Sequence, residues 1–376
     1  MPFPEELDYW INEVSTAFCQ LSTTQARVLA LYSYGMALTS HCGQTIIVTF
    51  LSLLLKLPHH NLRQRLREWN YEPQQKRGKK RRAVEVESQF AALLGWVLGY
   101  WEDGQRLVLA LDVTYLCDRH TILSISVVYR GTAIPVAWQV LLGNEKGEWH
   151  PLWVRLLECL QGAVSQQHRV YVLCDRGLYS KRLFEVITQC GWHPLMRIRP
   201  QGKYRRCKAK TWQALETVAY RGMPGKRLRV QCFKGDPLLC TLWVQWHPRY
   251  DEPCLIVSDL SPKQLVGSPY ALRVWIEAGF KDLKRGGLHW EQTKTTAPLR
   301  LQRLLLVMAV ALFWLIRQGS ALKDELLHER LAPALSCTTL GWLSTLVCAI
   351  QQRPLPFAYF VPYSFSPSPS SLKTYP

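Results

Sequence analysis

The stretch Tyr270-Ala-Leu-Arg-Val-Trp-Ile-Glu-Ala-Gly-Phe-Lys-Asp-Leu-Lys284 predicts an amphipathic helix that holds one carboxylate among several basic groups. Polar side chains recur there every three or four residues and would therefore share one face. One interpretation is a solvated face with ordinary ion pairs four residues apart. The other is a functional site, and the choice depends on the sequence upstream. The residues of this face are Tyr270, Arg273, Glu277, Lys281 and Lys284.

Two apolar strands upstream each lead into an aspartate. They are Arg106–Asp112 and Arg169–Asp175. We expect the two strands to be parallel neighbours, so that their C-terminal ends lie together where open α/β sheets bind ligands. One such aspartate is commonly a turn former or a helix cap. Two of them, together with Glu277, are harder to explain in that way.

Three clustered carboxylates repel one another at neutral pH and need a partner of opposite charge. Hard oxygen ligands with open positions suit Mg²⁺ or Mn²⁺. Two such ions about 4 Å apart can activate a hydroxyl and stabilise the leaving oxygen of a phosphodiester. We therefore predict that Asp112, Asp175 and Glu277 are catalytic and bind two Mg²⁺ ions, with Mn²⁺ as the alternative.

The fold class that we predict is α/β, with a mixed sheet flanked by helices. Residues 1 to about 100 have helical periodicity, and strand patterns begin at residue 106. Hairpin strands followed by crossover units indicate a mixed sheet. A long apolar helix at Leu301–Ile316 should cover it. The elements expected between are strands at 106–112, 121–128 and 132–140, a helix at 150–164, a strand at 169–175, a helix at 179–190 and a strand at 194–198.

A β-rich segment at about 201–260 interrupts this order, with strand-like alternation at Arg227–Phe233 and Leu238–Trp246. It would be an insertion between the Asp175 strand and the Tyr270 helix. We therefore expect three parts. These are a helical, basic DNA-binding region at 1–100, a catalytic α/β domain at 101–352 that contains the insertion, and a Pro/Ser-rich tail at 353–376.

The charge of the chain favours a polyanionic partner. Lys and Arg number 46 against 28 for Asp and Glu, which gives a formal charge of +18. A surplus of this size points to nucleic acid. A block of six basic residues within seven positions is either a solvated linker or a strap that binds DNA phosphates. Its members are Lys76, Arg77, Lys79, Lys80, Arg81 and Arg82.

Other features indicate a cytoplasmic protein of a prokaryote, located at the nucleoid. The N-terminus does not have the pattern of a secretory signal. The apolar runs Thr45–Leu55 and Leu304–Ile316 are too short to span a bilayer and predict buried helices. The 12 cysteines lack C-x-x-C pairs and are typical of reduced core thiols. Nothing in the sequence supports a membrane partner.

Taken together, the motifs resemble those of a DDE transposase. Asp112-Val-Thr and Asp175-Arg-Gly each follow an apolar strand, and Tyr270, Arg273, Glu277 and Lys284 form the pattern Y-x2-R-x3-E-x6-K. That four-residue pattern is similar to the YREK signature of the bacterial insertion-sequence-four family. The resemblance covers about 105–290. It implies a ribonuclease-H-like core with an insertion between the second aspartate and the glutamate.

The same resemblance implies roles for individual residues. Asp112, Asp175 and Glu277 would be the metal ligands, and the basic residues of the signature helix would hold phosphates near the cleaved transposon end. An insertion tryptophan of such enzymes stacks on a flipped base, for which Trp243 and Trp246 are the candidates and Trp246 is favoured. A tryptophan on a strand is more commonly a packing residue. Together with the basic block, which is predicted to contact DNA from its charge, the residues predicted to contact DNA are Tyr270, Arg273, Lys281, Lys284, Trp246, Lys79, Lys80, Arg81 and Arg82.

The function that follows is a DNA transposase, which cuts transposon ends and joins them to target DNA by two-metal-ion phosphodiester transfer. Its partners would be double-stranded DNA, namely terminal inverted repeats and target, and a second copy of the chain in a synaptic complex. Two alternatives stay open: a catalytically inert DNA-binding protein derived from a transposase, and a metal-dependent nuclease without strand transfer. Among the other acids, Asp118 predicts a turn residue, and Asp282 should point away from Glu277.

Overall fold

The structure is a computed structural model that describes residues 3–77, 82–101, 106–143, 145, 148–265, 269–328 and 335–355. The chain forms two compact units, and it passes between them more than once. Among the described residues, the first unit comprises 3–77, 82–101, 113–143, 145, 148–166, 275–328 and 335–355, and the second comprises 106–112, 167–265 and 269–274. The three-part domain division expected from the sequence stays a prediction.

The first unit begins with a group of helices, as the periodicity predicts. Ser22 caps the second of them: its hydroxyl accepts from the Gln25 backbone N–H, and the Gln25 side chain accepts from the Ser22 N–H in return. Such a reciprocal cap satisfies two donors that a helix start otherwise leaves unpaired. The helices are α1 (Phe3–Ala17), α2 (Thr23–Thr39), α3 (Gln44–Leu55), α4 (His59–Trp69) and α5 (Phe90–Leu98).

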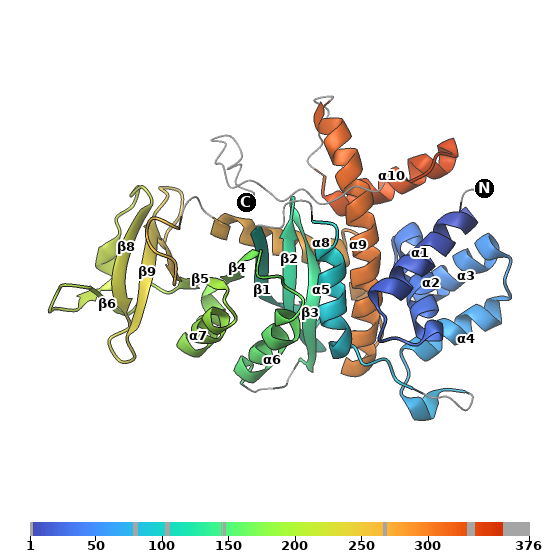
Figure 1. Cartoon of the computed structure of the whole chain (residues 1–376), viewed down its shortest axis with the longest axis horizontal. Coiled ribbons are helices and arrows are strands. Elements are labelled where there is room, and N and C mark those ends of the chain that lie inside the picture. The colour runs from blue at the N-terminus through green and yellow to red at the C-terminus, as the bar shows by residue number, and fades with distance from the viewer. Residues whose placement is uncertain are drawn as a thin grey trace. The chain divides into compact units, whose positions relative to one another are not determined.

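A buried hairpin forms the sheet portion of the first unit. Its two strands are joined at Arg130 and Gly131, which both have positive φ, 41° and 93°. Two successive left-handed residues are what a tight hairpin turn requires. Helices α5, α6 and α9 pack against β3, the second strand of this hairpin (Figure 1). The elements are β2 (His120–Tyr129), β3 (Thr132–Leu142), α6 (His150–Gln161), α8 (Val274–Leu283), α9 (Pro298–His328) and α10 (Cys337–Gln351).

Helix α9 is the central core element of the first unit. The predicted helix Leu301–Ile316 is confirmed as buried, but α9 is almost twice as long. By length and composition its first 26 residues could cross a membrane, yet 83% of their most apolar window is buried inside the protein. Trp314 lies at its middle, with the rings of Trp10 and Tyr34 edge-on to it at 4.7 and 5.5 Å. Its apolar character is therefore explained by core packing.

The second unit contains most of the sheet. Strand β4 is parallel to both β1 and β5, whereas β10, β9, β8, β6 and β7 continue in antiparallel fashion. The ten strands follow the order β3-β2-β1-β4-β5-β10-β9-β8-β6-β7. The predicted mixed α/β sheet is thus confirmed. The elements are β1 (Arg106–Leu116), β4 (Arg169–Cys174), α7 (Lys181–Gln189), β5 (His193–Ile198), β6 (Lys203–Arg206), β7 (Gln213–Ala214), β8 (Lys226–Cys232), β9 (Leu238–Gln245) and β10 (Cys254–Ser258).

Two element predictions need correction. Strand β1 does not end at Asp112 but continues to Leu116, although its pairing with β4 stops at Leu111. The stretch Tyr270–Lys284 is not one helix: a 3-10 turn at Pro269–Arg273 precedes α8, and α8 ends at Leu283. Tyr270 and Arg273 therefore lie in the 3-10 turn, whereas Glu277 and Lys281 lie on α8.

Candidate active site

Asp112 and Asp175 are brought together in the second unit by a single arginine. One terminal nitrogen of the Arg273 guanidinium lies 3.1 Å from Asp112 Oδ2 and 3.3 Å from Asp175 Oδ2. The Arg273 and Asp112 side chains are only 15% and 16% exposed, whereas that of Asp175 is 38% exposed. Two carboxylates from neighbouring strands therefore share one cation at a partly desolvated place, where charge interactions are stronger than in water.

The strand register explains why these two aspartates meet. β1 and β4 are parallel, and their last matched pair is Leu111 with Cys174. The next residue on each strand is an aspartate, so the two side chains leave the same edge on the same side of the sheet. Asp175 begins a short 3-10 turn, but its side chain makes no capping hydrogen bond. The helix-cap explanation for this residue is therefore not supported.

Tyr270 and Arg273 face inward rather than lining an exposed face with Glu277. The Tyr270 hydroxyl donates a hydrogen bond of 3.3 Å to the backbone carbonyl of Cys174, and the side chain is 9% exposed. Burial raises the pKa of this phenol far above its ordinary value. Arg273 bonds to the two aspartates and its side chain is only 15% exposed, so a solvated helix face does not describe this arginine.

Glu277 and Lys281 are exposed on α8, which belongs to the first unit. Lys284 follows the end of α8 and is half-buried. The pKa of its amine is lowered overall, because the effect of burial exceeds the opposite effect of nearby Glu291. The structure thus describes Glu277 and the aspartate pair in separate units. The predicted roles of all these residues in catalysis and DNA binding stay predictions.

Asp282 is a buried anchor of α8. It is 5% exposed and accepts hydrogen bonds from Thr132 Oγ1 on β3 (2.9 Å) and from Ser336 Oγ, the cap of α10 (3.0 Å). One turn earlier, a Cβ added at Gly279 would lie 2.8 Å from the Ala133 carbonyl oxygen, so only glycine lets α8 approach β3 this closely. The position of the helix that carries Glu277 is therefore set by buried contacts.

The donor chemistry of the aspartate pair suits a divalent cation. Carboxylate oxygens are the ligands that Mg²⁺ and Mn²⁺ prefer, and this pair already converges on one positive group. Within the residues that the structure describes, no group of three or more His, Cys, Asp or Glu side chains has the arrangement of a metal site. The two aspartates, Asp112 and Asp175, are therefore suitable ligands for a divalent cation.

Of the predicted DNA-contact residues in the basic block, Lys79, Lys80 and Arg81 lie outside the described residues, and Arg82 is exposed. The base of this loop is held by Arg303 of α9. Its guanidinium donates to the carbonyls of Asn70 (3.2 Å) and Val84 (3.1 Å). A buried arginine thus fixes the segments on either side of the basic block.

The two candidate tryptophans have different environments. Trp243 is 5% exposed on β9, where it packs between neighbouring strands. Trp246 follows β9, is partly exposed, and donates from Nε1 to the Tyr250 carbonyl at 2.9 Å. Only Trp246 is accessible enough to stack on a base.

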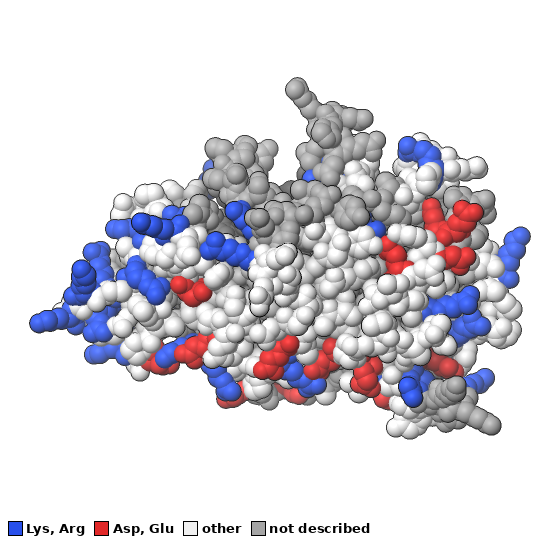
Figure 2. Space-filling model, in the orientation of Figure 1, with Lys and Arg blue, Asp and Glu red and all other residues white. Residues whose placement is uncertain are grey.

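Sequence reasoning missed how strongly basic the segment around β6 to β9 is. Residues 199–249 carry 12 Lys and Arg against 2 Asp and Glu, a net charge of 12 − 2 = +10. Figure 2 shows Lys and Arg gathered over β6 and β8. Arg205 lies over the Trp212 ring at 5.0 Å. A basic stretch at 202–210 is already evident in the sequence, and a count over the whole segment gives the full surplus.

Paired acidic residues at the carboxyl edge of a mixed α/β sheet form a candidate site for a divalent cation, and comparison specifies the family. The family model described as the transposase DDE domain matches residues 117–314, more than half of the chain. The chain therefore belongs to the DDE transposase family. The matched span contains Asp175 and Glu277 and begins after Asp112.

Among solved structures, one similar chain is the piggyBac transposase in a synaptic complex with hairpin DNA, determined by cryo-EM. The sequences are 13% identical, the match covers 65% of this chain and 53% of that one, and the TM-score is 0.35. The match thus spans about half of that protein. No curated protein matches the chain.

Proposed function

We propose that this chain cuts the ends of a transposon and joins them to target DNA by two-metal-ion phosphodiester transfer. Membership of the DDE transposase family supports the class of enzyme. One observation carries the site: Asp112 and Asp175, at the same edge of neighbouring parallel strands, converge on the guanidinium of Arg273 from the signature stretch. The finer assignments, a ribonuclease-H-like core of the insertion-sequence-four type and a homodimer on double-stranded DNA, belong to the same proposal.

In this proposal Asp112, Asp175 and Glu277 hold two Mg²⁺ ions, or Mn²⁺. When bound, such ions activate an attacking hydroxyl and stabilise the leaving oxygen. Arg273 would compete with such ions for the charge of the aspartates, because its guanidinium bonds to one oxygen of each. Its planar set of N–H donors then suits a DNA phosphate.

Tyr270 takes a supporting role. Its hydroxyl is already used by the Cys174 carbonyl next to Asp175, so it fixes the turn that carries Arg273 against β4. A phosphate contact by Tyr270 would require this hydrogen bond to break. Lys281 and Lys284 on and after α8 supply further positive charge for phosphates.

The test is a reaction of the purified chain with a labelled duplex that contains the genomic DNA flanking its gene, mixed with a target plasmid and Mg²⁺. We expect cut ends and joined products, both lost in Asp112→Asn, Asp175→Asn and Glu277→Gln. Cuts without joined products would favour a metal-dependent nuclease. Binding without cuts by the unaltered chain would favour a catalytically inert derivative.

A further inference from the structure

We infer that Arg197 on β5 is a phosphate-binding residue of the same site. The inference rests on the proposed function and specifies which group holds the DNA strand next to Asp175. The sequence offers no motif for it, because Arg197 lies in the ordinary alternation of a short strand. Three independent features of the second unit support it: strand register, local electrostatics and the way in which β5 is held.

The register places Arg197 in one row with the two aspartates. β4 is parallel to β1, with Leu111 opposite Cys174, and β5 is parallel to β4, with Cys174 opposite Met196. The residues that follow these matched positions are Asp112 on β1, Asp175 directly after β4, and Arg197 on β5. Because the positions before them lie side by side on neighbouring strands, the three residues lie at the same end of the sheet in the order carboxylate, carboxylate, guanidinium.

The local electrostatics agree with this position of Arg197. Burial raises the pKa of the Cys254 thiol, the charge of Arg197 lowers it, and that of Asp175 raises it. Both Arg197 and Asp175 also act on the phenol of Tyr270, again with opposite signs. The two charges are thus both near the same two buried groups, as the strand register indicates.

Arg197 has no carboxylate of its own. Among the described residues it forms no ion pair, whereas Arg273 pairs with both aspartates of the row. It is nevertheless only partly exposed. A partly desolvated guanidinium whose N–H donors bond to no carboxylate can take an anionic ligand, and the fork of N–H donors matches a phosphate. The non-bridging oxygens of a DNA phosphate next to Asp175 are the anion that the proposed reaction brings there.

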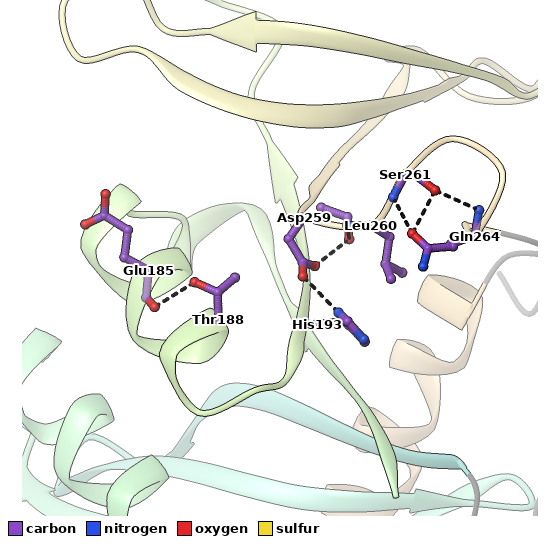
Figure 3. A network of polar contacts seen from close by, with 8 residues as sticks. Glu185, Thr188, His193, Asp259, Leu260, Ser261 and Gln264 are labelled. Atoms are coloured by element: carbon purple, nitrogen blue, oxygen red, sulfur yellow. Dashed lines mark hydrogen bonds and ion pairs between the residues drawn. The ribbon is translucent and has the colours of Figure 1, made fainter. Parts of the chain in front are cut away.

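Strand β5 holds this arginine in a fixed position. It pairs with β4 on one side and with β10 on the other, where Arg197 is opposite Ile256. At the start of β5, His193 Nδ1 bonds to Asp259 Oδ2 at 2.8 Å, just beyond the end of β10 (Figure 3). The backbone that carries Arg197 is therefore restrained on both sides and at its first residue, as a binding group requires.

The experiment measures binding of the full-length chain to the flanking-DNA duplex by fluorescence anisotropy, over a series of salt concentrations and without divalent metal. For Arg197→Gln we expect affinity to fall roughly tenfold or more, as for loss of a hydrogen bond between charged groups. The slope of log affinity against log salt should fall by about one unit. Arg197→Lys should keep the slope and lose part of the affinity.

The matched control is Arg169→Gln. It removes the same charge from the same sheet, but Arg169 is the first residue of β4, at the opposite edge, where it lies over the Tyr171 ring at 5.6 Å. We expect its affinity and salt slope to stay close to those of the unaltered chain. Equal losses in Arg169→Gln and Arg197→Gln would overturn the inference, because they would reflect net charge alone.

Two further outcomes separate this inference from the proposed function. If Arg197→Gln binds with unchanged affinity and salt slope while Asp175→Asn is inactive in cleavage, the role of Arg197 is wrong and the active site stands. If Asp175→Asn cleaves as the unaltered chain does, the proposed active site itself fails. A weaker Arg197→Gln complex with an unchanged salt slope would also overturn the inference, since a folding defect loses affinity without losing a phosphate contact.

Discussion

Arg273 donates a hydrogen bond of 3.1 Å to Asp112, across 161 residues of sequence. The same nitrogen lies 3.3 Å from Asp175. Without this guanidinium, two partly buried carboxylates at one sheet edge would repel each other. The arginine of the signature stretch thus has a structural function before any metal or DNA binds, and it competes for the oxygens that a metal would use.

Replacing Arg273 should therefore tighten metal binding. In Arg273→Gln the aspartates lose their internal cation, so Mn²⁺ no longer has to displace it. We expect the affinity for Mn²⁺, measured by isothermal titration calorimetry on the full chain without DNA, to rise by about threefold to tenfold. Arg273→Lys keeps the charge and serves as the control, with a smaller change. Unchanged or weaker Mn²⁺ binding in Arg273→Gln would contradict this competition.

Asp282 should make the stability of the protein depend on pH. Burial raises the pKa of its carboxyl, and the hydroxyls of Thr132 and Ser336 only partly offset this. Because the folded state holds the proton more tightly than the unfolded state, this contribution to stability is present below the ordinary carboxyl range and is lost as pH rises through the raised pKa.

Asp282→Asn is predicted to remove that dependence. In urea titrations at each pH, the free energy of unfolding of this variant should increase relative to that of the unaltered chain as pH rises from 4 to 7. Asp282→Ala should instead lose roughly 1–3 kcal/mol throughout, because the Thr132 and Ser336 hydroxyls lose their acceptor. A constant difference between Asp282→Asn and the unaltered chain across this pH range would contradict the buried-carboxyl explanation.

Replacing the two insertion tryptophans should have different effects. Loss of Trp243 should mainly reduce stability, and loss of Trp246 should mainly reduce DNA binding. Trp243→Ala removes a ring that is 5% exposed and should cost about 3–5 kcal/mol of stability. Trp246→Ala loses one hydrogen bond to Tyr250 and should cost about 1 kcal/mol. If Trp246 stacks on a base, its removal should weaken binding of a duplex with an unpaired end base by about 1–3 kcal/mol. Equal binding by Trp246→Ala would exclude that role.

Arg303 should be essential for the base of the basic loop. It is 3% exposed and bonds to the Asn70 and Val84 carbonyls and to Glu72 at 2.7 Å. Arg303→Met leaves these groups without a partner, so we expect a loss of about 3–5 kcal/mol in chemical unfolding. Arg300→Met, one turn earlier on α9 and partly exposed, is the control and should cost about 1 kcal/mol or less. Similar losses for both would refute this role.

The sequence predicted the sheet better than the signature helix. Alternation and apolar runs located the strands, and the parallel pairing that joins Asp112 to Asp175 was correct. Periodicity counts residues and assumes one helical geometry, so it could not reveal the 3-10 turn at Pro269–Arg273. Within that turn the Tyr270 hydroxyl bonds to a carbonyl 96 residues earlier in the chain, a partner that local periodicity does not reveal.

Long-range partners account for the other differences. Asp282 was expected only to point away from Glu277, but its partners come from β3 and α10, which no local pattern connects to it. Arg197 carries no local signal either, since its proposed role arises from the register of three strands. The charge of residues 199–249 was readable from the sequence and needed only a count by segment.

The most direct test of the central claim is Mg²⁺-dependent cleavage of the flanking-DNA duplex by Asp175→Asn. Asp118→Asn is the matched control, since Asp118 is an exposed turn residue six positions after Asp112. We predict that Asp175→Asn lowers the cleavage rate by at least about a thousandfold while DNA binding persists, because a ligand of the catalytic metal is lost, and that Asp118→Asn cleaves normally. Cleavage by Asp175→Asn at the rate of the unaltered chain would contradict the account.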